Sequence, residues 1–167
     1  NAQGVVTAAL SVTRDITERK LADIALRQSQ QKFSTAFGSS PVAASIATAE
    51  DGRFIEANAN YERDFGWTQA DLIGRTSVEV GLWPDQATRQ PLADAIRQEG
   101  RLVDRETIWV HKNGERRNVS LSAELIDLNG TTCILAYATD ITVRKRAEQA
   151  LAASETQLRA VLDGGQS

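Results

Sequence analysis

The sequence predicts an α+β domain in which short helices cover one face of a five-stranded antiparallel sheet. Three features of the 167-residue chain lead to this expectation. Two short strand-like runs come first, helical stretches follow, and three longer strand-like runs come after position 100. Turn-forming pairs of Asn or Asp with Gly separate the strands of each expected hairpin. Long helical runs flank the whole region. Strands and helices segregated along a chain in this way are typical of α+β domains.

Each of the two flanking runs, 18–37 and 143–162, has the apolar spacing of a short coiled coil. Large apolar residues lie seven positions apart, with mostly small residues at the three- and four-residue steps between them. Such heptads favour paired helices, and they predict a homodimer. Because each run covers only about three heptads, an amphipathic helix packed on its own domain is the alternative. The predicted seam residues are Leu26, Phe33, Leu151 and Leu158.

The first two strands are expected on either side of an Asp-Gly turn. The sequence "GSSP" at 38–41 ends the preceding helical run, because Gly, Ser and Pro are helix breakers. The runs 42–48 and 54–59 then flank Asp51 and Gly52, a pair that accepts the positive φ of a tight turn. These runs therefore predict a β-hairpin.

Two helices are expected between this hairpin and the later strands. Thr68 can cap a short helix that Gly74 ends. A longer helix is expected to start near Thr88, with Pro91 in its first turn and Gly100 at its end.

The last three strands are expected at 101–112, 115–128 and 131–141. An Asn-Gly pair separates each from the next, and this pair is the strongest short signal for a hairpin. The second half of the domain is therefore a three-stranded antiparallel meander.

The composition is that of an ordinary globular domain, with 41% apolar and 25% charged residues. A net charge of −3 and a pI near 5.3 argue against a nucleic-acid-binding protein, which usually carries a basic face. No apolar run is long enough to cross a membrane, so we expect no direct membrane contact. The single cysteine, Cys133, cannot form an internal disulfide, which favours a reducing, cytoplasmic location.

A junction sequence occurs twice, as "RDITERK" at 14–20 and "TDITVRK" at 139–145. Its two aspartates are 125 residues apart, and a period of about one domain's length suggests a tandem array. The strand-like run 4–13 would then be an orphan last strand, either disordered or paired with an exposed sheet edge. The predicted parts are the tail of a preceding copy at 1–17, a linker helix at 18–37, the domain at 38–142, and a C-terminal linker helix at 143–167.

Four stretches of the sequence resemble a PAS domain of the S-box type with its PAC motif. They are "FSTAFGSSP", "DGRFIEANANYERDFGWTQADLIGR", "HKNGERRNVSLSAELID" and "ATDITVRKRAEQAL", and the resemblance covers about 33–145. It implies a sensory and dimerisation module in a multi-PAS bacterial signalling protein. The partners it implies are a second copy of the chain and the adjacent PAS and output domains, the latter of histidine kinase or diguanylate cyclase (GGDEF) type.

The resemblance further implies that the last strand passes a signal into the following helix. At this point Thr142 can cap the helix and Asp140 can favour its positive end, with Arg144 four residues further on. A capping contact contributes about 1 kcal/mol, which strain in the sheet could overcome. The alternative is that these residues only start a helix. The predicted signal junction consists of Asp140, Ile141, Thr142 and Arg144.

The sequence departs from the cofactor motifs of the family. The helical stretch 85–99 lacks the histidine that haem-binding relatives carry, and the Asn-Cys-Arg motif of covalent flavin sensors is absent. His111 is expected to be a solvent-facing strand residue, and Cys133 a small core residue. Haem and covalent flavin are therefore disfavoured, which leaves a small metabolite or no ligand.

Small residues in the first strand suggest room for such a ligand. The run 42–48 contains only small side chains besides Val42 and Ile46, and two tryptophans are candidate walls of a pocket. In the alternative, the tryptophans fill the space themselves. The candidate pocket residues are Ser45, Trp83 and Trp109.

No catalytic or metal-binding motif is present: there is no phosphate-binding glycine loop, no His-Glu-x-x-His pair and no Gly-x-Ser-x-Gly elbow. We therefore expect a non-catalytic fragment whose output domain lies elsewhere. Three functions remain open: a ligand-binding sensor, a ligand-free dimerisation and relay module, and, more weakly, a small-molecule enzyme.

Overall fold

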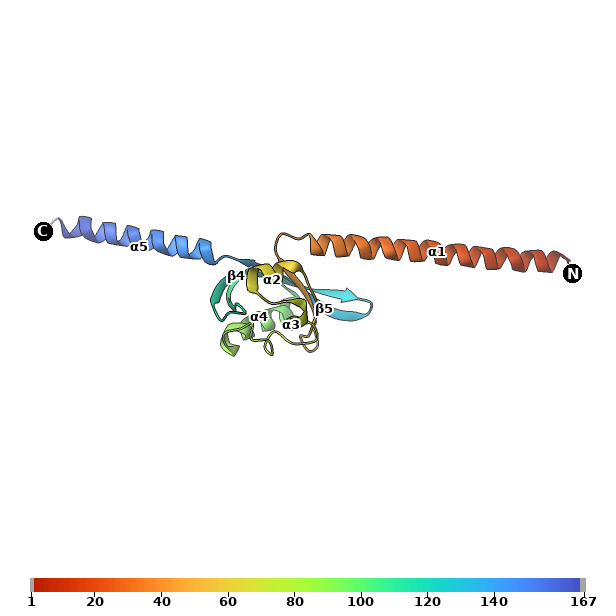
Figure 1. The fold of residues 1–167 in the computed structure, drawn as a ribbon, viewed down its shortest axis with the longest axis horizontal. Coiled ribbons are helices and arrows are strands. Elements are labelled where there is room, and N and C mark those ends of the chain that lie inside the picture. Colours follow the sequence, from red (N-terminus) through yellow and green to blue (C-terminus); the bar gives the residue numbers. More distant parts are fainter. Residues whose placement is uncertain (1, 166–167) are drawn as a thin grey trace. The chain divides into compact units, whose positions relative to one another are not determined.

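The computed structural model describes residues 2–165, and the side chains of 11–165. The chain divides into two compact units, of which one ends at Ser39 and the other begins at Ser40. The first unit contains α1 (Ala2–Gly38), and the second contains the sheet together with helices α2 to α5 (Figure 1). In the described part of the chain, no helix combines the length and the apolar character needed to cross a membrane.

The single helix α1 corrects the prediction of a strand at 4–13, because this run is helical together with the expected helix 18–37. A strand without its own sheet leaves its backbone donors and acceptors unpaired, whereas a helix satisfies them within the segment. Local pairs support the helix: Arg14 lies 3.3 Å from Glu18 one turn later, and the Thr17 hydroxyl donates to the Thr13 carbonyl. The sequence likeness between 4–13 and the last strand therefore did not predict the conformation of 4–13.

The second unit contains the predicted five-stranded antiparallel sheet, in the order β2-β1-β5-β4-β3. The α+β fold class is therefore confirmed. The central strand β5 pairs with both β1 and β4, so it joins the two hairpins into one sheet. The strands are β1 (Ala43–Thr48), β2 (Phe54–Ala57), β3 (Arg101–Val110), β4 (Arg116–Leu128) and β5 (Thr131–Asp140).

The two Asn-Gly turns differ in conformation. Asn129 and Gly130 both have positive φ, as the type I′ turn between twisted strands requires. In the turn between β3 and β4 only Gly114 has positive φ, and the His111 backbone N–H bonds the Glu115 carbonyl at 2.8 Å. The turn between β3 and β4 is therefore wider than the two-residue turn that its Asn-Gly pair predicted.

Three helices connect β2 to β3: α2 (Ala59–Phe65), α3 (Gln69–Leu72) and α4 (Gln86–Glu99). The predicted cap of α3 is confirmed, because the Thr68 hydroxyl and the Asp71 carboxylate accept each other's backbone N–H. The start predicted for α4 is wrong by two residues. Asp85 caps the helix by accepting the Thr88 backbone N–H at 2.7 Å, which places Pro91 beyond the first turn.

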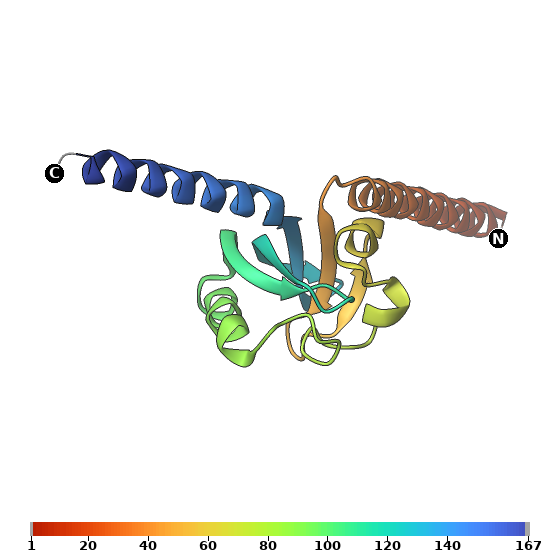
Figure 2. The same cartoon turned by 60° about the vertical axis from the view of Figure 1, so that its left-hand side comes forward.

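One face of the sheet packs on these helices and forms the core (Figure 2). Alternate residues of β4 point into it, namely Val119, Leu121 and Ala123. Tyr61 of α2 and Leu72 of α3 reach the same cluster from the helical side. The predicted placement of the short helices on one face is thus confirmed.

Candidate ligand cavity and helix junction

A cavity of about 120 Å³ lies between the core face of the sheet and α4. Pockets for drug-sized ligands begin at roughly 300 Å³, whereas an apolar cavity of roughly 150 Å³ holds a benzene-sized molecule. The cavity therefore suits a ligand whose buried part has about six non-hydrogen atoms. Its apolar lining includes Phe54, Leu82, Leu92, Ile96, Leu121 and Ile134.

A row of small side chains across three strands leaves this space open. Ser45 of β1 lies opposite Ala136 of β5, and Ala136 lies opposite Ala123 of β4. All three line the cavity. As expected, the small residues of the first strand leave room for a cavity. Two alanines from later strands enlarge this room.

The three predicted pocket residues, Ser45, Trp83 and Trp109, all line the cavity. The two indole rings meet edge to face, with centroids 5.9 Å apart. The Trp83 indole N–H donates to the Ser77 hydroxyl at 3.0 Å. The buried Trp109 N–H has no acceptor among the described residues. The tryptophans therefore form walls of the cavity without filling it.

Tyr61 was missed from the sequence, yet it supplies part of the cavity's polar surface. Its hydroxyl lies 3.2 Å from the Ser45 hydroxyl, and both residues are buried. Burial raises the pKa of the Tyr61 phenol well above its usual range, so the hydroxyl is neutral. The sequence signal for it was the pair Tyr61 and Phe65, four residues apart on one helical face.

A second hollow, of about 330 Å³, adjoins the cavity, and we call it the mouth. Gly52, Arg89, Ala93, Ile96 and Ile134 line both spaces. The mouth also carries charged side chains that the inner cavity lacks, from the β1–β2 turn and from α4: Glu50, Asp51 and Arg97. The cavity is thus mainly apolar, with Arg89 on the side that it shares with the charged mouth.

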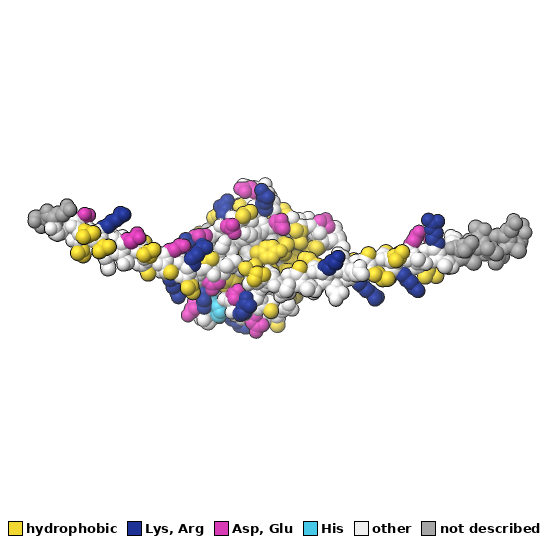
Figure 3. All heavy atoms as spheres, turned by 90° about the horizontal axis from the view of Figure 1, so that it is seen from above, with side chains coloured by type: hydrophobic (Ala, Val, Ile, Leu, Met, Phe, Trp, Pro, Cys, Tyr) yellow, Lys and Arg dark blue, Asp and Glu magenta, His cyan; other side chains and the backbone are white. Residues whose placement is uncertain are grey.

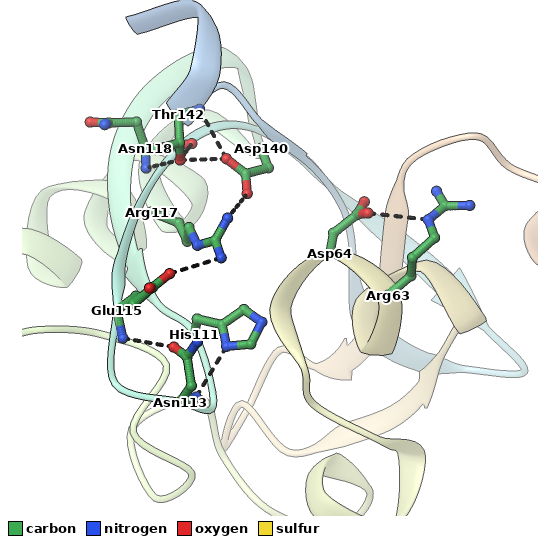
Figure 4. Close-up of polar contacts among 9 residues, drawn as sticks. All are labelled: Arg63, Asp64, His111, Asn113, Glu115, Arg117, Asn118, Asp140 and Thr142. Atoms are coloured by element: carbon green, nitrogen blue, oxygen red, sulfur yellow. Dashed lines mark hydrogen bonds and ion pairs between the residues drawn. The ribbon is translucent and has the colours of Figure 1, made fainter. Parts of the chain in front are cut away.

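The predicted junction lies where β5 ends and α5 (Thr142–Gly164) begins, and Figure 4 shows its contacts. The prediction that Thr142 caps the helix is wrong. Thr142 is the first helical residue after Ile141, and its backbone N–H donates to the Asp140 carboxylate at 2.9 Å. The Thr142 hydroxyl also contacts Asp140 and accepts the Asn118 N–H of β4 at 2.9 Å. Asp140 is therefore the residue that satisfies the helix start.

Arg117, which was not identified from the sequence, links the junction to the β3–β4 turn (Figure 4). Its guanidinium lies 3.3 Å from Asp140 and 2.9 Å from Glu115. The Glu115 backbone N–H in turn bonds the Asn113 side chain at 2.9 Å. The start of α5 and the hairpin turn thus belong to one polar network, because register places the end of β5 beside Arg117.

Comparison with known proteins assigns the family. Residues 37–146, more than half of the chain, match the family model described as the PAS fold. The chain belongs to the PAS family. No curated protein matches it.

Three solved structures illustrate the likeness of fold to this PAS domain. An RNA-binding light-oxygen-voltage receptor is 19% identical with a TM-score of 0.64, covering 76% of this chain and 37% of the receptor. A PAS domain from a two-component sensor histidine kinase is 15% identical with a TM-score of 0.56, covering 67% and 98% of the two chains. The PAS domain of a LuxR-family transcriptional regulator from Burkholderia thailandensis, in complex with ethanol, is 19% identical with a TM-score of 0.54, covering 65% and 96%. At these identities the likeness establishes the fold alone.

The remaining junction residue, Arg144, contacts β3. Its guanidinium lies 3.4 Å from Glu106 of β3, and the ammonium of the adjacent Lys145 lies 2.6 Å from the same carboxylate. The first turn of α5 in this PAS domain is therefore tied to β3, β4 and β5 at once.

The predicted seam residues are exposed in the single chain. Leu151 and Leu158 of α5 are 63% and 60% exposed, and Leu26 and Phe33 of α1 are 57% and 41% exposed. In α5 only Thr142 is buried, so the alternative of a helix packed along its own PAS domain is wrong for α5. Figure 3 shows hydrophobic side chains along the described helical segments and in a cluster on the globular part. These surfaces remain available to a partner.

The sequence also predicted the environments of two further residues of this PAS domain, Cys133 and His111. Cys133 is buried in β5, as expected, and it does not line the cavity. His111 was expected to face solvent, but it is half-buried beyond the end of β3 and accepts the Asn113 N–H on Nδ1. Gly66 explains this burial, because a Cβ there would lie 2.8 Å from His111 Cε1. The close approach of the imidazole was not visible in the sequence.

Proposed function

We propose that this PAS domain is a sensory module of a bacterial signal-transduction protein, which binds a small molecule in the cavity and relays its presence through α5. The single observation that carries the proposal is that β5 contributes to both places. Ile134 and Ala136 line the cavity, and the same strand ends at Asp140, which holds the start of α5. A ligand that shifts β5 therefore acts directly on the helix.

The comparisons support a sensory role, but they assign no stimulus to this chain. Structures of similar fold include a domain from a sensor histidine kinase and one in complex with ethanol. The parent protein is proposed to be a cytoplasmic, multi-PAS protein with a histidine kinase or diguanylate cyclase output. Catalysis is assigned to that output domain and not to the PAS domain.

The relay is tested in the intact parent protein by replacing Asp140 with Asn. Loss of the negative charge removes the ion pair with Arg117 and weakens the bond from the Thr142 N–H, so the output should change while the PAS domain stays folded. Thr139→Ala is the matched control, because Thr139 is an exposed neighbour on the same strand. Equal output from both variants and the wild type would refute the relay.

A ligand-free relay is the second candidate, favoured by the small volume of the cavity. Native mass spectrometry of the gently purified chain, compared with its denatured mass, separates the two. An extra mass retained per chain supports the sensor, and bare protein supports the relay.

Homodimerisation through α1 and α5 completes the proposal. Leu151→Glu places a charge in the predicted seam, so we expect a monomer in sedimentation analysis. Ala152→Glu, at the next position of the same exposed helix, is the control that should leave the dimer intact. If Leu151→Glu still sediments as a dimer, the interface is not this seam.

A further inference from the structure

We propose that the ligand of the cavity is a small monocarboxylate, whose apolar body fills the cavity and whose carboxylate pairs with Arg89 at the mouth. This inference rests on the proposed sensory function and assigns the chemical class of the ligand. It follows from three properties of the site: an unpaired arginine at the mouth, acidic residues beside it, and an apolar interior.

Arg89 is the one arginine in the described part of the chain that is half-buried and has neither an ion pair nor a hydrogen bond. The other arginines without such a partner are exposed, and the half-buried Arg117 has two carboxylate partners. Arg97 lines only the mouth and lies 3.4 Å from Asp94. Partial burial of an unpaired guanidinium is costly, so a carboxylate supplied by a ligand would remove that cost.

The acidic residues of the mouth limit the charge of the ligand. Glu50 and Asp51 line the hollow into which Arg89 extends. The hydrogen bond from the Thr48 hydroxyl holds the pKa of Asp51 below its usual value, so this carboxylate is ionised at neutral pH. Arg53 lies 3.1 Å from Asp51 and offsets part of its charge, so the repulsion comes mainly from Glu50. One negative charge on a ligand can be neutralised by Arg89, whereas the second charge of a phosphate or a dicarboxylate would meet this repulsion. The site therefore favours a single carboxylate.

The interior defines the body of the ligand. It is lined mainly by aliphatic and aromatic side chains and has room for a group the size of a benzene ring. Its polar groups are the hydroxyls of Ser45 and Tyr61 and the unpaired N–H of Trp109. They suit a neutral oxygen at the inner end of the ligand. A flat acid such as benzoate, or 4-hydroxybenzoate with its inner hydroxyl, has these features.

The test is an NMR titration of the 167-residue chain with benzoate and with benzamide, an uncharged molecule of nearly the same shape. We expect the wild type to bind benzoate at least about tenfold more tightly, since hydrogen bonds between an arginine and a carboxylate are stronger than neutral ones. Arg89→Gln should abolish this preference, mainly by weakening the binding of benzoate. Arg97→Gln, at the same mouth, should keep the preference.

Three other outcomes of the titration would each contradict a different part of the monocarboxylate proposal. Equal affinity of the wild type for benzoate and benzamide would exclude a carboxylate ligand but would keep the cavity as a binding site. A preference for benzoate that persists in Arg89→Gln would exclude Arg89 as the partner. If neither molecule binds, the monocarboxylate is refuted, while the relay still stands or falls with the output of the Asp140→Asn parent protein.

Discussion

The cavity and the helix junction share the strands of one sheet, but different kinds of contact hold them together. Around the cavity, Trp109 packs against Tyr61, Phe65 and Trp83, with ring centroids 5.1 to 5.9 Å apart. Such packing is strong and weakly directional. At the junction, Asp140 is held by hydrogen bonds and an ion pair, which are weaker in total but depend on direction.

This difference suggests a division of tasks within the PAS domain. Packing supplies most of the stability, so changes at the cavity should alter folding strongly. The polar network contributes less stability, and a small movement can break it. Under the proposed function, the junction is therefore the place where a weak signal would change the state of α5. The predictions below test this contrast, beginning with the largest effect.

Trp109→Ala should cause the largest loss of stability. Trp109 is buried and contacts three aromatic rings, so its removal enlarges the cavity and should lower the free energy of unfolding by about 3–5 kcal/mol. Urea denaturation followed by circular dichroism measures this value. Val103→Ala, at an exposed position of the same strand, should cost no more than about 0.5 kcal/mol. A loss below about 1 kcal/mol for Trp109→Ala would mean that the aromatic cluster does not dominate the stability.

Arg117→Gln should have a smaller effect on stability but a local effect on α5. The substitution leaves the partly buried Asp140 without its ion pair, which should lower the free energy of unfolding by about 1–2 kcal/mol. Hydrogen exchange of the amides in the first turn of α5 should become faster, while exchange in β1 changes little. The control is Arg116→Gln, because the neighbouring Arg116 is exposed. Equal exchange rates in the two variants would contradict a network centred on Arg117.

The features that could be predicted from the sequence are those that depend on neighbouring residues. The Thr68 cap and the turn at Asn129 and Gly130 follow from residues within four positions, and the structure contains both. The order of strands and helices follows in the same way, because each turn signal acts locally. The row of small residues was visible in part, since Ser45 lies in a run of alanines.

The features that could not be predicted depend on strand register or on distant neighbours. Arg117 meets Asp140 only because Val119 pairs with Asp140 across β4 and β5. Arg89 reaches the cavity only because α4 packs against the sheet. The run 4–13 shows the opposite error, in which likeness to β5 suggested a strand although the run is part of the helix α1. A repeated sequence can form the same strand twice only where the neighbouring strands that pair with it also occur twice.

The smallest expected effect is a pH dependence of the stability, which arises from Asp71. Its carboxylate links α3 to the β3–β4 turn. The ammonium of Lys112, 2.7 Å away, and the Thr68 backbone N–H lower the pKa of Asp71 to about 2. Since the pKa in the unfolded chain is about 3.9, this carboxylate stabilises the fold fully above pH 4. Its contribution is lost as the pH falls from about 4 to about 2, because protonation then favours the unfolded chain.

The urea midpoint of the wild type should therefore drop between pH 6 and pH 3 by more than that of Asp71→Asn. Asp64→Asn, which removes a carboxylate whose ion pair in the described part of the chain is with its neighbour Arg63, should retain the drop of the wild type. An identical drop in Asp71→Asn and the wild type would show that Asp71 makes no such contribution.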